Sequence, residues 1–446
     1  MKAITDYRSI LVVGLGQTGL SVAQYLAAKG LNFKVVDSRM NPPGKEALNN
    51  LGVTIQTQFG EFNPEFFADA DCLVVSPGIA ISTPVIKACA ERGAEVIGDI
   101  ELFVREAQAP LVAITGSNGK SSVTTLVGLM VEAAGWKAYA GGNLGIPALD
   151  FLTQSVPDVY VMELSSFQLE TTHSLQAKAA TVLNVSEDHM DRYDSYADYA
   201  AAKQVVYQGC EVAVVNRDDP LVMAMPTDGL KVSFGLDLPK KPNEYGIQVI
   251  DDESYLAKGD QALLPIKRMK LPGLHNAANA LAALALGEAL GLPFEPMLGA
   301  LQRFTGLPHR TQWVRELNGV AYYDDSKGTN VGATLAALAG MPNKTVLIAG
   351  GQGKGADFSP LAEVLARKAR ALVLIGEDRL KIAAVAEGQC PYVFADSMAE
   401  AVQKAAQLAQ AGDNVLLSPA CASFDMFKNY GHRGDVFVQA VLELPS

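Results

Sequence analysis

The sequence predicts an α/β protein of three domains. Its 446 residues exceed one ordinary domain, and 49% are hydrophobic against 19% charged, as in a globular protein. Short apolar runs that suit buried strands alternate with helical patterns, and several end in Gly-rich or Ser-rich loops, where open parallel sheets bind ligands. We expect a Rossmann-like domain over residues 1–98, a central phosphate-loop domain over 99–306 with a parallel sheet and added antiparallel strands, and a Rossmann-like α/β domain over 307–446.

Composition narrows the classes of function. The net charge of −12 argues against a nucleic-acid partner. The five cysteines show no metal-binding spacing, so we expect free thiols in a reducing compartment. The first ten residues lack the apolar core of a signal peptide, and Glu288 interrupts the most apolar helix. We therefore expect a cytoplasmic protein without a membrane partner.

The first domain opens with a glycine-rich turn. The strand Ile10–Val13 precedes Gly14-Leu15-Gly16-Gln17-Thr18-Gly19, and a second strand, Phe33–Val36, ends at Asp37. This pattern satisfies the dinucleotide fingerprint, which keeps an NAD-dependent oxidoreductase open as a function. The same turn would also receive another nucleotide diphosphate, or serve packing alone.

The central domain carries a phosphate-binding loop. The strand Leu111–Thr115 runs into Gly116-Ser117-Asn118-Gly119-Lys120-Ser121, and a helical pattern continues to Gly135. Backbone N–H groups of such a turn face an anion, while Lys120 would reach the outer phosphates and Ser121 would hold magnesium. The loop is the shorter form, with Ile114 where the longer motif has glycine. A glycine turn with a surface lysine is the alternative.

Three further residues of this domain suggest metal or phosphate chemistry. Glu163 closes the strand Val159–Met162, where such sheets place a magnesium-binding carboxylate, although a helix-capping acid is the alternative. His189 lies among four acids, which suggests a metal or phosphate site or else a solvated acidic loop. Lys203 belongs to a helix that starts near Tyr196, and a single helical lysine is ordinarily solvated.

Later segments predict strands and an amide-bearing helix. Four short runs of alternating residues predict antiparallel strands: Val212–Val215, Lys231–Phe234, Tyr245–Ile250 and Ala262–Ile266. Earlier in the chain, the glycine-rich stretch Gly141–Gly145 predicts a loop. Asn276 and Asn279 share one face of a long Ala/Leu helix and suit adenine edges, although capping would also explain Asn276.

The last domain predicts five strands in a mainly parallel sheet: Ala321–Asp325, Thr345–Ala349, Ala371–Ile375, Tyr392–Ala395 and Val415–Ser418. Loops at three of their ends, 324–330, 350–354 and 418–423, are rich in small residues, and two contain a lysine. Such loops suit the capture of a carboxylate or a phosphate.

Together these motifs resemble the Mur ligase family over the whole chain. The resemblance rests on residues 116–121, 163–170, 184–193, 275–279, 307–310, 325–330 and 418–423. It implies that ATP phosphorylates the carboxylate of a UDP-N-acetylmuramoyl substrate and that an amino acid attacks the acyl phosphate, in cytoplasmic peptidoglycan precursor synthesis. The Asp-Asn-Pro-Arg motif of the diaminopimelate- and lysine-adding members is absent, which favours D-glutamate addition to UDP-N-acetylmuramoyl-L-alanine. Another Mur-type ligase and an oxidoreductase are the alternatives.

The resemblance also implies the residues of the ATP and magnesium sites. The ATP contacts would be Gly116, Ser117, Asn118, Gly119, Lys120, Ser121, Asn276, Asn279, Arg310 and Asp325. Two magnesium ions are implied, one on Ser121 and Glu163 and one on His189 and Lys203, a lysine that the family carbamylates. The implied catalytic residues are Lys120, Glu163, His189, Lys203 and Lys327.

The other two substrates are assigned in the same way. The UDP substrate would contact Gln17, Thr18, Ser38, Arg39, Ser76, Gly78 and Asn143. D-glutamate would contact Thr329, Lys354, Ser423, Phe424 and Tyr430, although the family often has Leu and Phe at the last two positions. The implied partners are these small molecules alone, with a monomeric protein whose third domain closes over the second.

Overall fold

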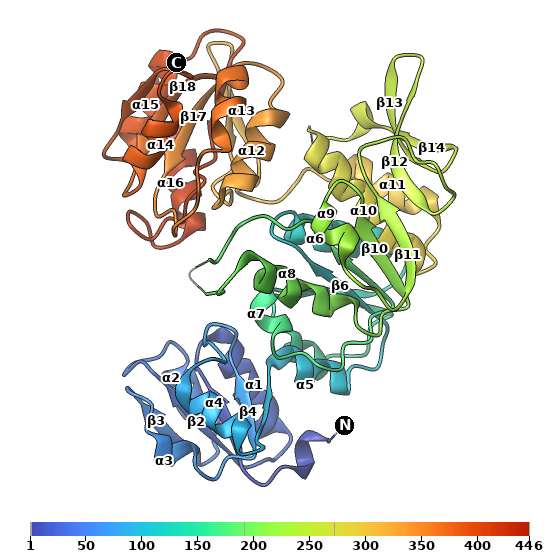
Figure 1. The fold of residues 1–446 in the computed structure, drawn as a ribbon, viewed down its shortest axis with the longest axis vertical. Coiled ribbons are helices and arrows are strands. Elements are labelled where there is room, and N and C mark those ends of the chain that lie inside the picture. The colour runs from blue at the N-terminus through green and yellow to red at the C-terminus, as the bar shows by residue number, and fades with distance from the viewer. Residues whose placement is uncertain (1, 191, 272, 446) are drawn as a thin grey trace.

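The computed structural model describes residues 2–190, 192–271 and 273–445 and builds them around three β-sheets (Figure 1). The first sheet has the order β3-β2-β1-β4-β5, and all its pairs are parallel. Alternate residues of β1 pack into two different hydrophobic clusters, because helices cover both faces of the sheet. Its elements are η1 (Ile4–Asp6), β1 (Ile10–Val13), α1 (Gln17–Ala28), β2 (Phe33–Asp37), α2 (Lys45–Asn49), β3 (Gln56–Phe59), α3 (Pro64–Phe67), β4 (Cys72–Val75), α4 (Pro84–Glu91) and β5 (Glu95–Ile97).

The second sheet, teal to yellow-green in Figure 1, has the order β14-β13-β12-β11-β10-β9-β6-β8-β7. Its first half comprises α5 (Asp99–Glu106), β6 (Leu111–Thr115), α6 (Lys120–Ala133), β7 (Ala138–Gly142), η2 (Ala148–Thr153), β8 (Val159–Glu163), α7 (Ser166–Leu169), β9 (Ala179–Val182), α8 (Tyr196–Gln204) and η3 (Val205–Tyr207). The rest comprises β10 (Val212–Asn216), α9 (Pro220–Ala224), β11 (Leu230–Phe234), β12 (Glu244–Ile250), β13 (Glu253–Lys258), β14 (Gln261–Pro265), η4 (Ile266–Arg268), α10 (Leu274–Ala289) and α11 (Phe294–Arg303).

The antiparallel part of this sheet is smaller than the sequence predicted. The first two predicted runs, β10 and β11, extend the parallel sheet, because β10 is buried on both faces. Among the described residues of this sheet, only the β12–β13 and β13–β14 pairs are antiparallel, and Val249 on β12 is exposed. Gly141 and Gly142, predicted in a loop, end strand β7 instead.

The third sheet, orange to red in Figure 1, has the order β15-β16-β20-β17-β18-β19 and is parallel apart from the edge pair β15–β16. Strand β15 was not predicted, because its half-exposed sequence Gln-Trp-Val-Arg-Glu-Leu lacks a buried face. The elements are β15 (Gln312–Leu317), β16 (Val320–Asp324), α12 (Val331–Gly340), β17 (Thr345–Gly350), α13 (Leu361–Lys368), β18 (Ala369–Ile375), α14 (Arg379–Ala386), β19 (Tyr392–Phe394), α15 (Met398–Leu408), β20 (Asn414–Leu417) and α16 (Tyr430–Leu442).

Loops from the carboxyl ends of the second and third sheets line one shared cleft. Arg310, just before β15, donates from Nη2 to the Ser121 hydroxyl at 2.6 Å, which ties the third sheet's unit to the start of α6. No helix within the described ranges has the length and apolar character needed to cross a membrane.

Candidate active site

The phosphate loop joins β6 to α6, and two glycines give it its shape. Gly116 and Gly119 have φ of +142° and +85°, which residues with a side chain rarely adopt. A Cβ on Gly119 would lie 2.5 Å from the Asn279 side-chain oxygen, so the loop also approaches α10 closely. The loop leads directly into the first turn of α6, and the N–H groups of a helix N-terminus suit an anion.

Lys120 and Lys203 converge on this loop. The Lys120 Nζ donates to the carbonyls of Gly116 at 2.8 Å and Ser117 at 3.0 Å, and the Lys203 Nζ donates to the same Gly116 carbonyl at 3.0 Å. Burial and the neighbouring Lys120 ammonium lower the pKa of Lys203 well below that of an ordinary lysine. The alternatives of a surface lysine at 120 and a solvated lysine at 203 are therefore wrong.

Glu163 ends β8 inside the cleft and is 3% exposed. Its Oε1 accepts a hydrogen bond of 2.7 Å from the Asn143 amide, while its Oε2 has no hydrogen-bond partner among the described residues. The capping alternative is wrong, because Ser165 caps the following helix. A buried carboxylate oxygen without a partner is a suitable magnesium ligand. The described residues contain no group of three His, Cys, Asp or Glu side chains arranged around a metal.

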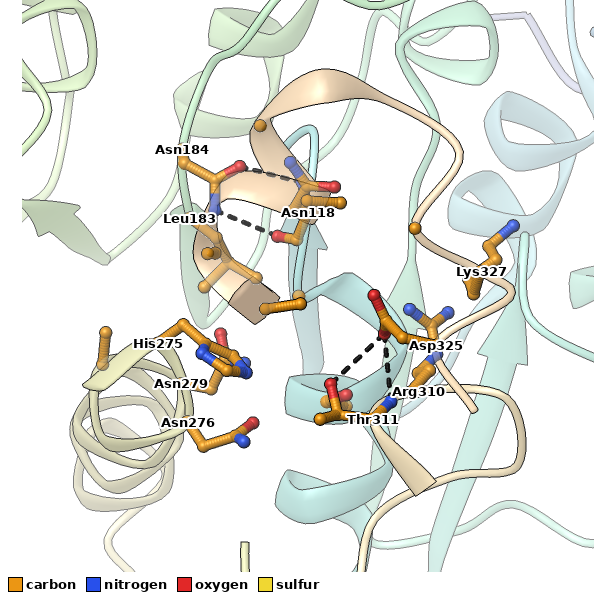
Figure 2. Close-up of a pocket in the computed structure, with 18 of the residues that line it drawn as sticks. Asn118, Leu183, Asn184, His275, Asn276, Asn279, Arg310, Thr311, Asp325 and Lys327 are labelled. Carbon is orange, nitrogen blue, oxygen red and sulfur yellow. Dashed lines mark hydrogen bonds between the residues drawn. The ribbon is translucent and has the colours of Figure 1, made fainter. Parts of the chain in front are cut away.

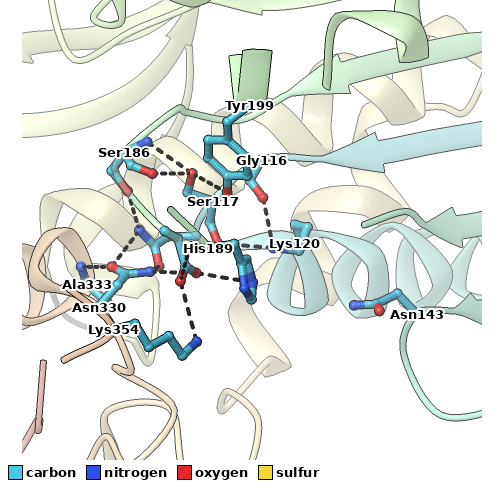
Figure 3. Close-up of polar contacts among 12 residues, drawn as sticks. Gly116, Ser117, Lys120, Asn143, Ser186, His189, Tyr199, Asn330, Ala333 and Lys354 are labelled. Atoms are coloured by element: carbon cyan, nitrogen blue, oxygen red, sulfur yellow. Dashed lines mark hydrogen bonds and ion pairs between the residues drawn. The ribbon is translucent and has the colours of Figure 1, made fainter. Parts of the chain in front are cut away.

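The acidic loop after β9 belongs to the cleft rather than to open solvent. His189 has a φ of 58°, and the centre of its ring lies 4.9 Å from the centre of the Phe167 ring in an edge-to-face arrangement. The His189 Nε2 lies 3.6 Å from Asp188 Oδ2. Asp188 in turn lies 3.7 Å from the Lys354 Nζ, which comes from the third sheet (Figure 3). The loop therefore faces both domains that form the cleft.

A second cavity, of about 320 Å³, adjoins the phosphate loop and suits a flat base (Figure 2). Asn276 and Asn279 of α10 border one side, and Arg310 and Asp325 border the other. Asn276 is not the helix cap, which is Gly273. Burial raises the pKa of Asp325 to about 7, although hydrogen bonds from the Ser418 hydroxyl and from Thr311 oppose the rise.

The third domain contributes cations and a small polar pocket to the cleft, which holds about 430 Å³. The Lys327 ammonium lies 4.0 Å from the centre of the Tyr430 ring, and burial, with Arg310 and Lys120 nearby, lowers its pKa to about 8. All five residues predicted to contact D-glutamate line this cleft: Thr329, Lys354, Ser423, Phe424 and Tyr430. Ser423 is buried, whereas Phe424 is 68% exposed.

Six of the residues predicted to contact UDP lie apart from this cleft, beyond the carboxyl ends of strands of the first sheet. Gln17 and Thr18 begin α1, and the others lie in the loops after β2 and β4: Ser38, Arg39, Ser76 and Gly78. None of them lines the cleft. The Gln17 amide reaches the Gly145 carbonyl at 3.4 Å, beside the predicted seventh residue, Asn143, so the first domain meets the central one at this point.

In the oxidoreductase alternative, Asp37 would accept a hydrogen bond from a ribose hydroxyl of the dinucleotide. Its two oxygens accept four hydrogen bonds, from the Leu15 N–H and from the N–H, Nε and Nη2 of Arg39, at 2.7–2.8 Å. These bonds outweigh burial and lower the pKa of Asp37. Since a carboxylate has about four acceptor positions, none is left for a ribose hydroxyl. This argues against the dinucleotide function.

Several residues that line the cleft or the second cavity were missed by sequence reasoning. Asn184 holds the loop by accepting from the Asn118 N–H at 2.8 Å and donating to the Asn118 carbonyl at 3.1 Å. The Tyr199 hydroxyl lies 3.0 Å from the Ser117 hydroxyl. Asn330 caps α12 and contacts the loop from the third domain. Position after a strand could have suggested Asn184 and Asn330, but nothing in the sequence marks Tyr199.

The fold and site define a three-domain, nucleotide-binding α/β enzyme whose cleft lies between the second and third domains. Family models match in the same order: "Mur ligase MurD-like, N-terminal domain" over residues 8–98, "Mur ligase middle domain" over 114–287 and "Mur ligase, glutamate ligase domain" over 309–421. The chain belongs to the Mur ligase family.

Relatives in sequence and structure agree with this assignment. A UDP-N-acetylmuramoylalanine–D-glutamate ligase from Nitrosococcus oceani is 52% identical to the chain, over 98% of this chain and 97% of the relative. The ligase of the same name from Pseudomonas aeruginosa is 53% identical, over 100% of both chains. A solved UDP-N-acetylmuramate–alanine ligase from Thermotoga maritima shares the fold, with a TM-score of 0.60 at 19% identity over 97% of this chain and 98% of that one.

Proposed function

We propose that this protein uses ATP to join D-glutamate to UDP-N-acetylmuramoyl-L-alanine in peptidoglycan precursor synthesis. One observation carries the proposal: a single cleft holds the phosphate loop and Glu163 of the second domain opposite Lys327, Lys354 and Ser423 of the third. A nucleoside triphosphate and an acidic amino acid would meet there. The relatives named for this activity are similar over their full length.

ATP would lie across the two connected cavities. Asn276 and Asn279 suit the adenine, and Arg310 and Asp325 approach from the third domain. The phosphates would lie on the N–H groups of residues 119–121, because those of Ser117 and Asn118 already donate to the backbone and side-chain oxygens of Asn184. Lys120 would turn from the loop carbonyls toward the outer phosphates. Phosphoryl transfer needs mainly such positioning and charge neutralisation.

The proposal includes two magnesium sites. Ser121 and Glu163 would hold one ion, which fits the unpartnered Oε2 of Glu163. His189 and Lys203 would hold the other once Lys203 is carbamylated, because an ammonium repels a cation whereas a carbamate offers oxygen ligands. A lowered pKa favours the neutral amine that adds to CO₂ with loss of one proton. Bound magnesium would neutralise charge on the transferring phosphoryl group.

The remaining residues would position the other two substrates. The UDP group would bind in the first domain, and its muramoyl arm would pass Asn143 to place its carboxylate beside the γ-phosphate. Lys327 would stabilise negative charge as the acyl phosphate forms. Lys354, Thr329 and Ser423 would hold the D-glutamate carboxylates so that its amine attacks the acyl carbon and expels phosphate. Closure of the third domain would exclude water from the acyl phosphate.

The proposal includes the organisation of the chain. We infer domains at 1–98, 99–306 and 307–446, since a family-model match falls within each. The protein would act in the cytoplasm as a monomer, with small molecules as its partners.

Phosphate release measured with ATP, magnesium, UDP-N-acetylmuramoyl-L-alanine and a panel of amino acids tests the proposal. Release with D-glutamate alone is the expected result. Release with another amino acid would instead assign a different Mur-type activity, and no release with any of them would refute the proposed function.

A further inference from the structure

Two asparagines join the phosphate loop to the third domain through a reciprocal amide pair. The Asn118 Nδ2 donates to Asn330 Oδ1 at 3.3 Å, and the Asn330 Nδ2 donates to Asn118 Oδ1 at 3.2 Å. The two residues are 212 positions apart in the chain. Asn118 is also fixed on its own side, because its Nδ2 donates to the Ser186 hydroxyl at 3.2 Å.

The third domain presents Asn330 rigidly. Its Oδ1 also accepts from the Ala333 N–H at 2.8 Å, which makes Asn330 the N-cap of α12. A Cβ on Gly332 would lie 3.0 Å from the Ser186 hydroxyl, so the first turn of α12 packs closely against the loop that follows β9. The amide pair therefore lies within a close contact between the two domains (Figure 3).

Asn330 also reaches the amino-acid side of the cleft. Its Nδ2 lies 3.4 Å from Asp188 Oδ2, and Asp188 Oδ1 lies 3.7 Å from the Lys354 Nζ. The same carboxylate lies 3.6 Å from His189 Nε2. One asparagine side chain thus connects the phosphate loop to the acid that faces both the proposed metal ligand His189 and the proposed glutamate-binding Lys354.

We infer that Asn330 is a positioning residue that couples the ATP side of the cleft to the D-glutamate side. The phosphate loop and Lys354 take their relative places through the Asn118–Asn330 pair and through Asp188. The inference rests on the proposed function, since it assigns Lys354 to D-glutamate. It does not assign Asn330 a contact with any substrate.

The variant Asn330→Ser tests this role, because serine caps a helix as well as asparagine does but cannot reach Asn118 and Asp188. We expect an unchanged thermal midpoint and a KM for the UDP substrate within twofold of wild type. The KM for D-glutamate should rise about tenfold or more, because the variant loses the three hydrogen bonds that Asn330 makes with Asn118 and Asp188. Asn63→Ser is the matched control, since Asn63 caps the short helix α3 away from the cleft. It should leave every constant unchanged.

A double-mutant cycle completes the test. If the pair carries the coupling, Asn118→Ser combined with Asn330→Ser should raise the KM for D-glutamate less than the product of the two single effects. Purely multiplicative effects, or an Asn330→Ser enzyme with wild-type KM for D-glutamate, would overturn the inference. Inactivity of the wild-type enzyme toward D-glutamate would instead refute the proposed function.

Discussion

Replacing Arg433 with methionine should loosen the two loops that form the amino-acid side of the cleft. Arg433 lies in α16 and is 1% exposed. Its Nε and Nη2 donate to the Ser326 hydroxyl at 3.0 Å and the Ser326 carbonyl at 2.7 Å, and its Nη1 donates to the Cys421 carbonyl at 3.1 Å. One guanidinium therefore ties the loop of Lys327 to the loop of Ser423.

The size of the effect follows from these three bonds. Each bond from a charged donor contributes about 1.5–3 kcal/mol, and burial of the guanidinium offsets part of the sum. Burial lowers the pKa of Arg433 to about 10, so the group stays charged at neutral pH. Methionine fills similar space but leaves the acceptors without donors. We expect a loss of about 3–5 kcal/mol, which corresponds to a fall of about 10–17 °C in the unfolding midpoint of the third domain.

Scanning calorimetry of the full chain, paired with the KM for D-glutamate, measures this effect. Arg433→Lys should fall between wild type and methionine, because one ammonium cannot span both loops. Arg315→Met is the control, since Arg315 also donates to two carbonyls of the third domain, those of Leu442 and Leu444, but is only partly buried. An Arg433→Met protein with a wild-type midpoint and wild-type KM would refute the reasoning.

Three further predictions concern the cleft. Lys203→Ala should abolish activity and regain part of it with small carboxylates, and full activity without them would exclude a carbamate ligand. Because the pKa of Lys327 is about 8, kcat/KM should fall as the pH rises through 8. Lys327→Arg should move this fall in kcat/KM above pH 10, and a fall that stays near pH 8 would show that another group titrates. Glu163→Gln keeps an acceptor for the Asn143 amide but removes the negative charge, so it should lower kcat by about 10²–10³-fold at an unchanged thermal midpoint. A fall in kcat of less than tenfold would count against a metal-binding role for Glu163.

Sequence reasoning succeeded where the signal is local. The phosphate loop was predicted because an apolar strand, a glycine turn and a helix follow one another directly in the chain, and Glu163 was predicted because it ends a buried strand. Prediction was weaker for β10 and β11, whose orientation depends on the strand beside them. It failed for β15, an edge strand with no continuous apolar face.

The composition of the cleft depended on distant contacts. As an isolated helical residue, Lys203 would be solvated, yet it lies against Gly116, 87 positions away, because α8 packs beside the phosphate loop. Its lowered pKa is a result of that burial. Asp37 satisfied the dinucleotide pattern, and only the folded positions of Leu15 and Arg39 showed that its oxygens are already occupied.

The sequence by itself determined the α/β class, the positions of most strands and loops, and the residue types able to bind phosphates, a cation and carboxylates. It could do so because strand periodicity and turn chemistry act over a few residues. The tertiary structure decided which of these groups meet: Arg310 with Ser121, Asn330 with Asn118, and Asp188 with Lys354. Those contacts join loops from different sheets. They follow from strand order and domain packing, which bring together residues that no local pattern connects.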